Sequence, residues 1–146
     1  MSNSPRVLQK QLYTASATST GGRMGTVNVQ DGAEYKLTIP QGMGGPGGEG
    51  TNPEQLFAAG YAACFGSAVD HLARLKKITT GPVAITVKAS IGPVEGGAFG
   101  LAVALSAKIP EMKRDEAEAL VKAAHEVCPY SNATRGNIVV DVRLED

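Results

Sequence analysis

The segment that decides the fold comprises residues 51–65, which read TNPEQLFAAGYAACF. Asn52 is suited to cap the start of a helix, and Pro53 fits the first helical position. No residue from 56 to 69 is charged, so a helix formed here has no charged face to turn toward water. These features predict a helix that begins near Pro53, ends near Leu75 and is buried on most of its sides.

A second helix is predicted from about Arg114 to Val127. Its apolar residues recur at helical spacing and form one stripe: Ala117, Leu120, Val121, Ala124 and Cys128. Pro129 is expected to end this helix, because proline cannot continue the hydrogen-bond ladder. Cys128 should therefore lie at the carboxyl end of the helix, on the face turned to the core.

Outside the helices, apolar and polar residues alternate as they do in strands. The alternation occupies residues 27–29, 35–39, 83–91, 101–109 and 138–144. Asp31 and Gly32 supply the chemistry of a tight turn between the first two of these segments. Strands with one face in water are typical of antiparallel sheets. We therefore predict an α+β fold in a single domain covering residues 1–146.

Charge and composition exclude several classes of function. Lys and Arg total 14, and Asp and Glu total 14, so the chain has no basic excess for a nucleic acid or a membrane surface. The first residues, MSNSPR, lack the layout of a secretory signal. We therefore expect a cytoplasmic protein, in which a purely structural disulfide would not persist.

The two cysteines, Cys64 and Cys128, allow three interpretations. They can be small buried hydrophobic residues, metal ligands together with His71 and His125, or a redox pair. Cys64 and His71 would stand about 10 Å apart along their helix, given a rise of about 1.5 Å per residue. This separation disfavours one metal ion shared by all four side chains. The histidines are then expected to be partly exposed helix residues.

A glycine-rich segment at residues 42–50 formally contains a dinucleotide-binding pattern. That pattern requires its third glycine to open a helix inside a parallel strand–helix–strand unit. Neither condition is met by the predicted elements. We interpret the segment as a loop.

A reactive Cys64 would need a nearby cation. An unperturbed thiol has a pKa of about 8.5, and burial raises that pKa further. Cys64 lies too far into its helix for the helix dipole to ionise it, because that effect fades within the first turn. Arg23 follows an uncharged stretch at residues 13–22 and could supply the charge, with Glu54 as its anchor. The alternatives are a surface arginine and an acidic residue that complements the helix dipole.

At these residues the chain resembles a known family. Residues 51–65 resemble the first cysteine block of organic hydroperoxide resistance (Ohr) proteins, in the OsmC/Ohr family. Residues 128–137, CPYSNATRGN, resemble the second block, and residues 13–25 resemble the arginine segment. The resemblance covers nearly the whole chain. The block at Tyr61 and the tail after Cys128 are more similar to the Ohr branch than to the OsmC branch.

The resemblance implies a fold and a set of roles. The implied fold is an intertwined homodimer with antiparallel sheets around two long central helices. Cys64 is implied to be the peroxidatic cysteine and Cys128 the resolving one, with Arg23 holding the Cys64 thiolate and Glu54 orienting Arg23. The implied activity is reduction of alkyl or fatty-acid hydroperoxides through a Cys64 sulfenic acid and a Cys64–Cys128 disulfide. No bound cofactor is implied; dihydrolipoamide or a lipoylated protein would be the reductant.

Four apolar residues are expected to line a substrate pocket: Met24, Phe57, Tyr61 and Phe99. Residues of these types are more often simple core, which is the alternative for each of them. Two further functions stay open beside the Ohr activity. One is an OsmC-type peroxidase of broader substrate range, and the other is a non-catalytic domain that binds zinc or an apolar ligand.

Overall fold

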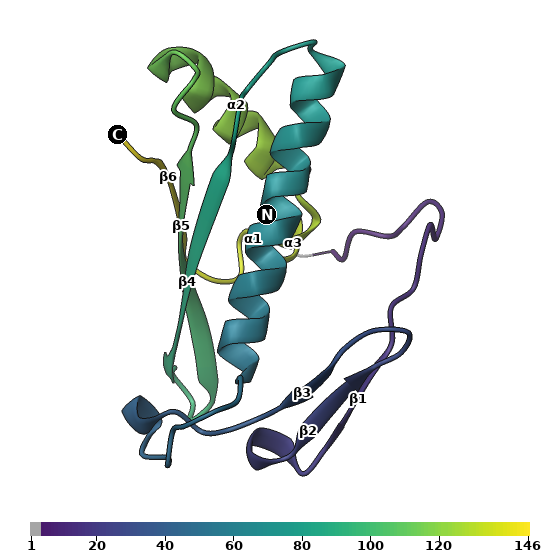
Figure 1. Cartoon of the computed structure of the whole chain (residues 1–146), viewed down its shortest axis with the longest axis vertical. Helices are drawn as coiled ribbons and strands as arrows, with labels where there is room; N and C mark the ends of the chain where they lie inside the picture. Colours follow the sequence, from purple (N-terminus) through teal and green to yellow (C-terminus); the bar gives the residue numbers. More distant parts are fainter. Residues whose placement is uncertain (1–3) are drawn as a thin grey trace. The chain divides into compact units, whose positions relative to one another are not determined.

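A computed structural model describes residues 4–146 of the chain, and it forms two compact units. The first unit ends at Asn52, and the second runs from Pro53 to Asp146. The α+β class predicted from the sequence is confirmed by the order of strands and helices (Figure 1). The prediction that residues 1–146 form one domain stays a prediction.

The first unit contains a three-stranded antiparallel sheet. Its strands are β1 (Ala17–Thr20), β2 (Thr26–Val29) and β3 (Glu34–Lys36), in the order β1-β2-β3. The turn between β2 and β3 contains Asp31 at a φ of 57°, so the predicted turn is confirmed. Short 3₁₀ helices follow β1, at Gly22–Met24, and β3, at Gln41–Met43. Residues 42–50 thus comprise the end of this 3₁₀ helix and a loop, not the strand-to-helix turn of a dinucleotide site.

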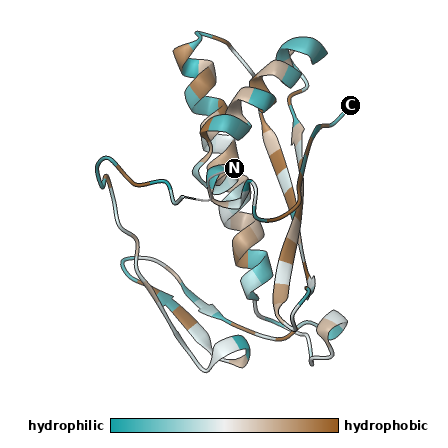
Figure 2. Cartoon of the chain, turned by 180° about the vertical axis from the view of Figure 1, so that it is seen from behind, coloured by the Kyte–Doolittle hydropathy of each residue, from teal (hydrophilic) through white to brown (hydrophobic). Residues whose placement is uncertain are grey.

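The second unit places helices against a sheet of its own. It contains α1 (Pro53–Leu75), β4 (Ala84–Pro93), β5 (Phe99–Lys108), α2 (Arg114–Val127), α3 (Pro129–Thr134) and β6 (Val140–Leu144). The sheet order is β4-β5-β6, and α1 packs on β4 and on α2. Hydrophobic and paler residues alternate along the strands (Figure 2), as the sequence pattern predicts.

The pairing of β6 differs from the prediction. Strands β4 and β5 pair antiparallel, from Ala84 opposite Lys108 to Pro93 opposite Phe99. Strand β6 runs parallel to β5, with Val103 opposite Val140. The physical reason is the connection: α2 and α3 lie between the two strands in sequence, and a helical crossover returns the chain in the same direction.

The helix boundaries largely follow the local signals. α1 begins at Pro53 and ends at Leu75, and α2 spans Arg114–Val127, as predicted. Pro129 ends α2 but also begins α3, which the sequence analysis did not predict. A proline at the first helical position has no hydrogen bond to lose there, so one residue can end one helix and start the next.

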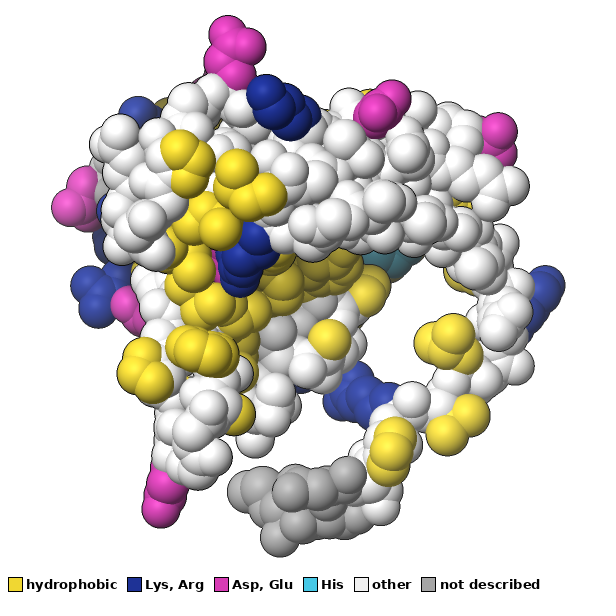
Figure 3. Space-filling view, turned by 90° about the horizontal axis from the view of Figure 1, so that it is seen from below, with side chains coloured by type: hydrophobic (Ala, Val, Ile, Leu, Met, Phe, Trp, Pro, Cys, Tyr) yellow, Lys and Arg dark blue, Asp and Glu magenta, His cyan; other side chains and the backbone are white. Residues whose placement is uncertain are grey.

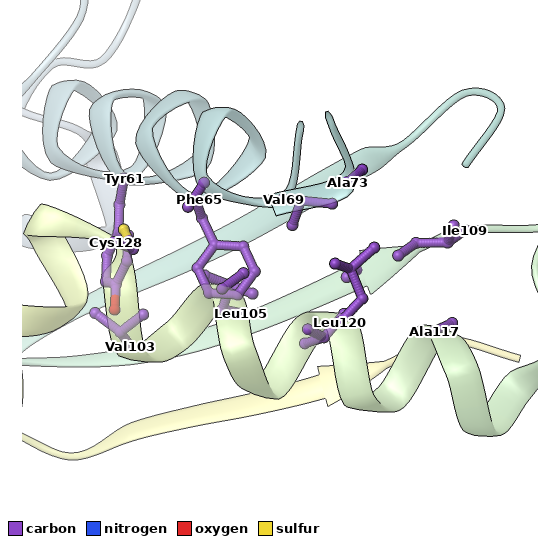
Figure 4. Packing of buried hydrophobic residues seen from close by; sticks show 14 residues of the cluster. Tyr61, Phe65, Val69, Ala73, Val103, Leu105, Ile109, Ala117, Leu120 and Cys128 are labelled. Carbon is purple, nitrogen blue, oxygen red and sulfur yellow. The ribbon is translucent and has the colours of Figure 1, made fainter. Parts of the chain in front are cut away.

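The core of the second unit lies between α1, α2 and β5 (Figure 4). The helix α1 contributes five buried residues: Tyr61, Phe65, Ala68, Val69 and Ala73. Its opposite side, including Ala59, Ala63 and Ser67, is exposed. The prediction that this helix is buried on most sides therefore holds for residues 56–69 except along this one stripe. A lack of charge does not by itself create a covering surface, so the stripe stays exposed in the single chain.

Phe65 should be a main support of this core. Its side chain is fully buried, whereas Phe99 is 75% exposed. We expect Phe65→Ala to lower the free energy of unfolding by about 3–5 kcal/mol, because it removes a buried ring and leaves a cavity. Phe99→Ala is the matched control and should change it by about 0.5 kcal/mol or less. Urea denaturation measures both, and equal losses would contradict this description of the core.

None of the helices formed by residues 4–146 combines the length and the apolar character that crossing a bilayer requires.

Candidate functional site

The two cysteines lie side by side in the second unit. The Sγ atoms of Cys64 and Cys128 are 3.6 Å apart, although the residues are 64 positions apart in sequence. Both are free thiols; Cys128 is fully buried and Cys64 is partly exposed. A disulfide has an S–S length of about 2.05 Å, so the two sulfur atoms are about 1.5 Å beyond the distance they would have in an oxidised pair.

Backbone structure holds each cysteine in place. Cys64 lies about three turns into α1. Cys128 is the junction between α2 and α3, with φ −64° and ψ 123°. Its N–H donates to the Ala124 carbonyl, and its own carbonyl accepts from the Asn132 N–H, both at 2.9 Å. The backbone of Cys128, the resolving cysteine implied by the resemblance, is thus fixed at the end of α2 and the start of α3.

The surroundings of Cys64 oppose its ionisation. Burial raises the pKa of the Cys64 thiol above its usual value, and the neighbouring Cys128 raises it too. A hydrogen bond with the Tyr130 backbone acts in the opposite direction and lowers that pKa. The net effect is a raised pKa. An added positive charge would therefore be needed to make Cys64 a thiolate at neutral pH.

Arg23 and Glu54 are placed separately by the structure. Arg23 is the middle residue of the 3₁₀ helix Gly22–Met24 in the first unit, and it is partly buried. Glu54 lies in the first turn of α1, also partly buried. The predicted pairing of Arg23 with Glu54 and Cys64 joins residues of the two units and stays a prediction. The alternative, a surface arginine on a turn, also stays open.

A chain of side-chain hydrogen bonds from Tyr61 through Ser131 to His125 lies near the cysteines, and no sequence pattern predicts it. The Ser131 hydroxyl lies 2.8 Å from the Tyr61 hydroxyl and 2.8 Å from Nδ1 of His125. Ser131 is fully buried and belongs to α3, the helix that begins after Cys128. The nearest signal in the sequence is the position of Ser131, one helical turn after Cys128.

Three aromatic rings gather beside Cys64. The ring centroids of Phe57 and Tyr61 are 6.1 Å apart, and those of Tyr61 and Tyr130 are 5.8 Å apart. Tyr61 is fully buried in the core cluster, as its alternative role of simple core requires, and Phe57 packs against that cluster, so their pocket role stays a prediction. Phe99 lies outside the core cluster and is exposed. Met24 is 55% exposed in the first unit.

The histidines are arranged differently from each other. His71 is exposed on α1, whereas His125 is partly buried and held by Ser131. Within residues 4–146, no three His, Cys, Asp or Glu side chains gather as ligands of a metal ion.

Comparison with known proteins gives the family. The model for OsmC-like proteins matches residues 45–143, which is more than half of the chain and includes both cysteines. The chain belongs to the OsmC family. This confirms the resemblance found in the two cysteine blocks.

Relatives within the family are similar over nearly their full length. The organic hydroperoxide resistance protein of Xanthomonas axonopodis pv. citri is 52% identical over 138 residues, covering 93% of this chain and 96% of that protein. OhrB of Bacillus subtilis is 44% identical over 135 residues, covering 92% of this chain and 97% of that protein. The crystal structure of an organic hydroperoxide resistance protein from Legionella pneumophila matches with a TM-score of 0.89 and 50% identity. It covers 94% of this chain and 100% of that one.

Proposed function

We propose that this protein is a thiol-dependent peroxidase that reduces organic hydroperoxides to alcohols. The observation that carries the proposal is the contact between two free thiols, with Cys64 and Cys128 Sγ atoms 3.6 Å apart. The names of its relatives, organic hydroperoxide resistance proteins, support the same substrate class. Alkyl and fatty-acid hydroperoxides are the expected substrates.

The reaction has two steps, oxidation of Cys64 and closure of the disulfide. The Cys64 thiolate attacks the distal oxygen of the hydroperoxide, the O–O bond breaks, and the alcohol leaves after taking up a proton. Cys64 is then a sulfenic acid. The Cys128 sulfur attacks the Cys64 sulfur, the S–O bond breaks, and the thiol proton and the hydroxyl leave as water. The product is the Cys64–Cys128 disulfide.

Arg23 supplies the positive charge that this chemistry needs. The pKa of Cys64 is raised by burial, so a guanidinium close to the sulfur would restore the thiolate and stabilise charge on the peroxide. Glu54 would orient Arg23 by a charge-assisted hydrogen bond. The partial burial of both side chains supports these roles.

A dithiol returns the enzyme to its reduced state. Thiol–disulfide exchange with a dihydrolipoyl group, free or on a lipoylated protein, would break the Cys64–Cys128 bond through a mixed disulfide. The partly exposed Cys64 is the sulfur that such a reductant can reach, because Cys128 is fully buried. No bound cofactor takes part.

The working form is a homodimer. Large apolar side chains of the first unit are exposed in the single chain: Val7, Leu8, Leu12 and Tyr13 are each at least 74% exposed. Between residues 56 and 69, α1 exposes only the small uncharged residues Ala59, Ala63 and Ser67. Hydrophobic side chains also reach the surface on the face drawn in Figure 3. Such surfaces are typical of sites covered by a partner.

A count of free thiols tests the proposed function. The reduced protein has two thiols, and one equivalent of cumene hydroperoxide should remove both, because each turnover forms one disulfide. Dihydrolipoamide should restore both thiols faster than glutathione does. An OsmC-type enzyme of broader range would lose its thiols equally fast with hydrogen peroxide.

Two other results would contradict the proposal. Thiols that survive the hydroperoxide, together with stoichiometric zinc in elemental analysis, indicate a metal-binding domain. Surviving thiols with a co-purified apolar molecule indicate a non-catalytic carrier.

A further inference from the structure

We propose that Ser131 is a positioning residue, whose buried hydroxyl ties α3 to α1 through Tyr61 and to α2 through His125, and so holds Cys128 beside Cys64. This inference rests on the proposed function, since it concerns the step in which Cys128 attacks the Cys64 sulfenic acid. Ser131 is not part of the reacting pair. It would act through the position of the helix that begins at Cys128.

The hydroxyl of Ser131 joins three different helices. It lies on α3, its partner Tyr61 on α1 and its partner His125 on α2, and both contacts are 2.8 Å long. Ser131 and Tyr61 are fully buried. A hydroxyl has one proton and two lone pairs, so it can donate to one of these partners and accept from the other.

The direction of the hydrogen bonds depends on the tautomer of His125. Burial lowers the pKa of His125, and the charge of Arg135 lowers it further, while Glu126 opposes them. The imidazole is therefore neutral at neutral pH, and its Nδ1 accepts when the proton is on Nε2. In that tautomer Ser131 donates to His125 and accepts from the Tyr61 hydroxyl; with the proton on Nδ1 both directions reverse, and in either case the Ser131 hydroxyl keeps both partners.

The Tyr61–Ser131 hydrogen bond and the Cys64–Cys128 contact both join α1 to the start of α3. Tyr61 precedes Cys64 by three residues on α1, so the two side chains share one face. Ser131 follows Cys128 by three residues, and the Asn132 N–H bonds to the Cys128 carbonyl at 2.9 Å. Moving the first turn of α3 away from Tyr61 would therefore move Cys128 away from Cys64.

Other contacts also hold α3, to α2 through Arg135 and to α1 through the Tyr130 ring, which packs near Phe57 and Tyr61. The Arg135 guanidinium donates to the His125 carbonyl at the end of α2 and to Asn132 at 2.6 Å. The Tyr61 hydroxyl has a second contact with Thr134, but it is longer, at 3.4 Å. The link through Ser131 is thus the shorter of the two hydroxyl contacts between α1 and α3.

The variants Ser131→Ala and Tyr61→Phe test the link. Each removes one hydroxyl from it and keeps the rest of the side chain close to its original volume. Ser106→Ala is the matched control, because Ser106 also makes a side-chain hydrogen bond, at 3.1 Å to Glu145, but on β5. Rapid mixing with one equivalent of cumene hydroperoxide separates sulfenic acid formation from disulfide closure.

We expect both variants to slow closure about tenfold while sulfenic acid formation changes by less than about twofold, because only the second step depends on the approach of Cys128. Equilibration in dithiothreitol redox buffers should show a less negative potential for the disulfide, by about 30 mV for each tenfold loss of effective thiol concentration. A general loss of stability would leave that potential unchanged, because it acts equally on both redox states. Ser106→Ala should match the unmodified protein in all measurements.

The proposal is overturned if either variant closes its disulfide at the rate of the unmodified protein, or if the potential does not move. If Ser131→Ala fails to fold, Tyr61→Phe alone decides by the same criteria. The redox-buffer measurement needs no hydroperoxide. The unmodified protein could fail to react with hydroperoxide while the variants still show shifted disulfide potentials. That result would overturn the proposed function and support the positioning role.

Discussion

Replacing Cys64 with serine is expected to abolish hydroperoxide reduction. The attacking group is a thiolate, and a serine hydroxyl does not ionise near neutral pH and cannot form a sulfenic acid. Losing its nucleophile costs an enzyme several orders of magnitude in rate. Consumption of cumene hydroperoxide, with dihydrolipoamide as reductant, measures the loss.

Cys128→Ser is the matched variant, because it keeps the first step and removes the second. Cys64 should then stop as a sulfenic acid, which a dimedone-type reagent traps and mass spectrometry locates. A variant without both cysteines should give no adduct. The assignment fails if Cys128→Ser gives no adduct while Cys64→Ser keeps its activity.

Replacing Arg23 with alanine is expected to cause the second largest loss. Burial raises the pKa of Cys64, and the proposed role of Arg23 is to bring it down. A change of about two pKa units corresponds to roughly 2.7 kcal/mol and about a hundredfold less thiolate below the pKa. The thiolate is the reactive form, so the pH of half-maximal rate should move upward and the rate at neutral pH should fall.

Two further variants make this test specific to the proposed role of Arg23. Arg23→Lys keeps the charge but loses the planar, two-pronged geometry of the guanidinium, so it should recover part of the rate. Arg6→Ala removes an arginine that lies on an exposed segment and should leave the pH profile unchanged. The ultraviolet absorbance of the thiolate, followed against pH, measures the pKa directly. An unchanged profile in Arg23→Ala would return Arg23 to the role of an ordinary arginine.

The helices could be predicted from the sequence because their signals are local. A proline at the first position of α1, and an apolar stripe that ends at Cys128, specify α1 and α2 to within a residue or two. These signals act between residues one or two turns apart, so no distant part of the chain has to be known. The same holds for the turn at Asp31.

The errors arose where distant segments decide the result. The alternation at residues 138–144 indicates a strand but says nothing of its neighbour, and β6 proved parallel to β5. The lack of charge at residues 56–69 indicates burial, but burial depends on what other elements cover, and Ala59 and Ala63 are exposed. Pro129 indicates the end of a helix, and the structure shows that it also begins α3.

The candidate site shows the same division. The sequence by itself determined that Cys64 lies within the uncharged stretch of one helix and Cys128 at the end of another, and its two cysteine blocks indicated the family. Only the tertiary structure decided that the two Sγ atoms lie 3.6 Å apart and that Ser131 joins Tyr61 to His125. The reason is that helix signals come from neighbouring residues, whereas these contacts depend on how α1, α2 and α3 pack around one core.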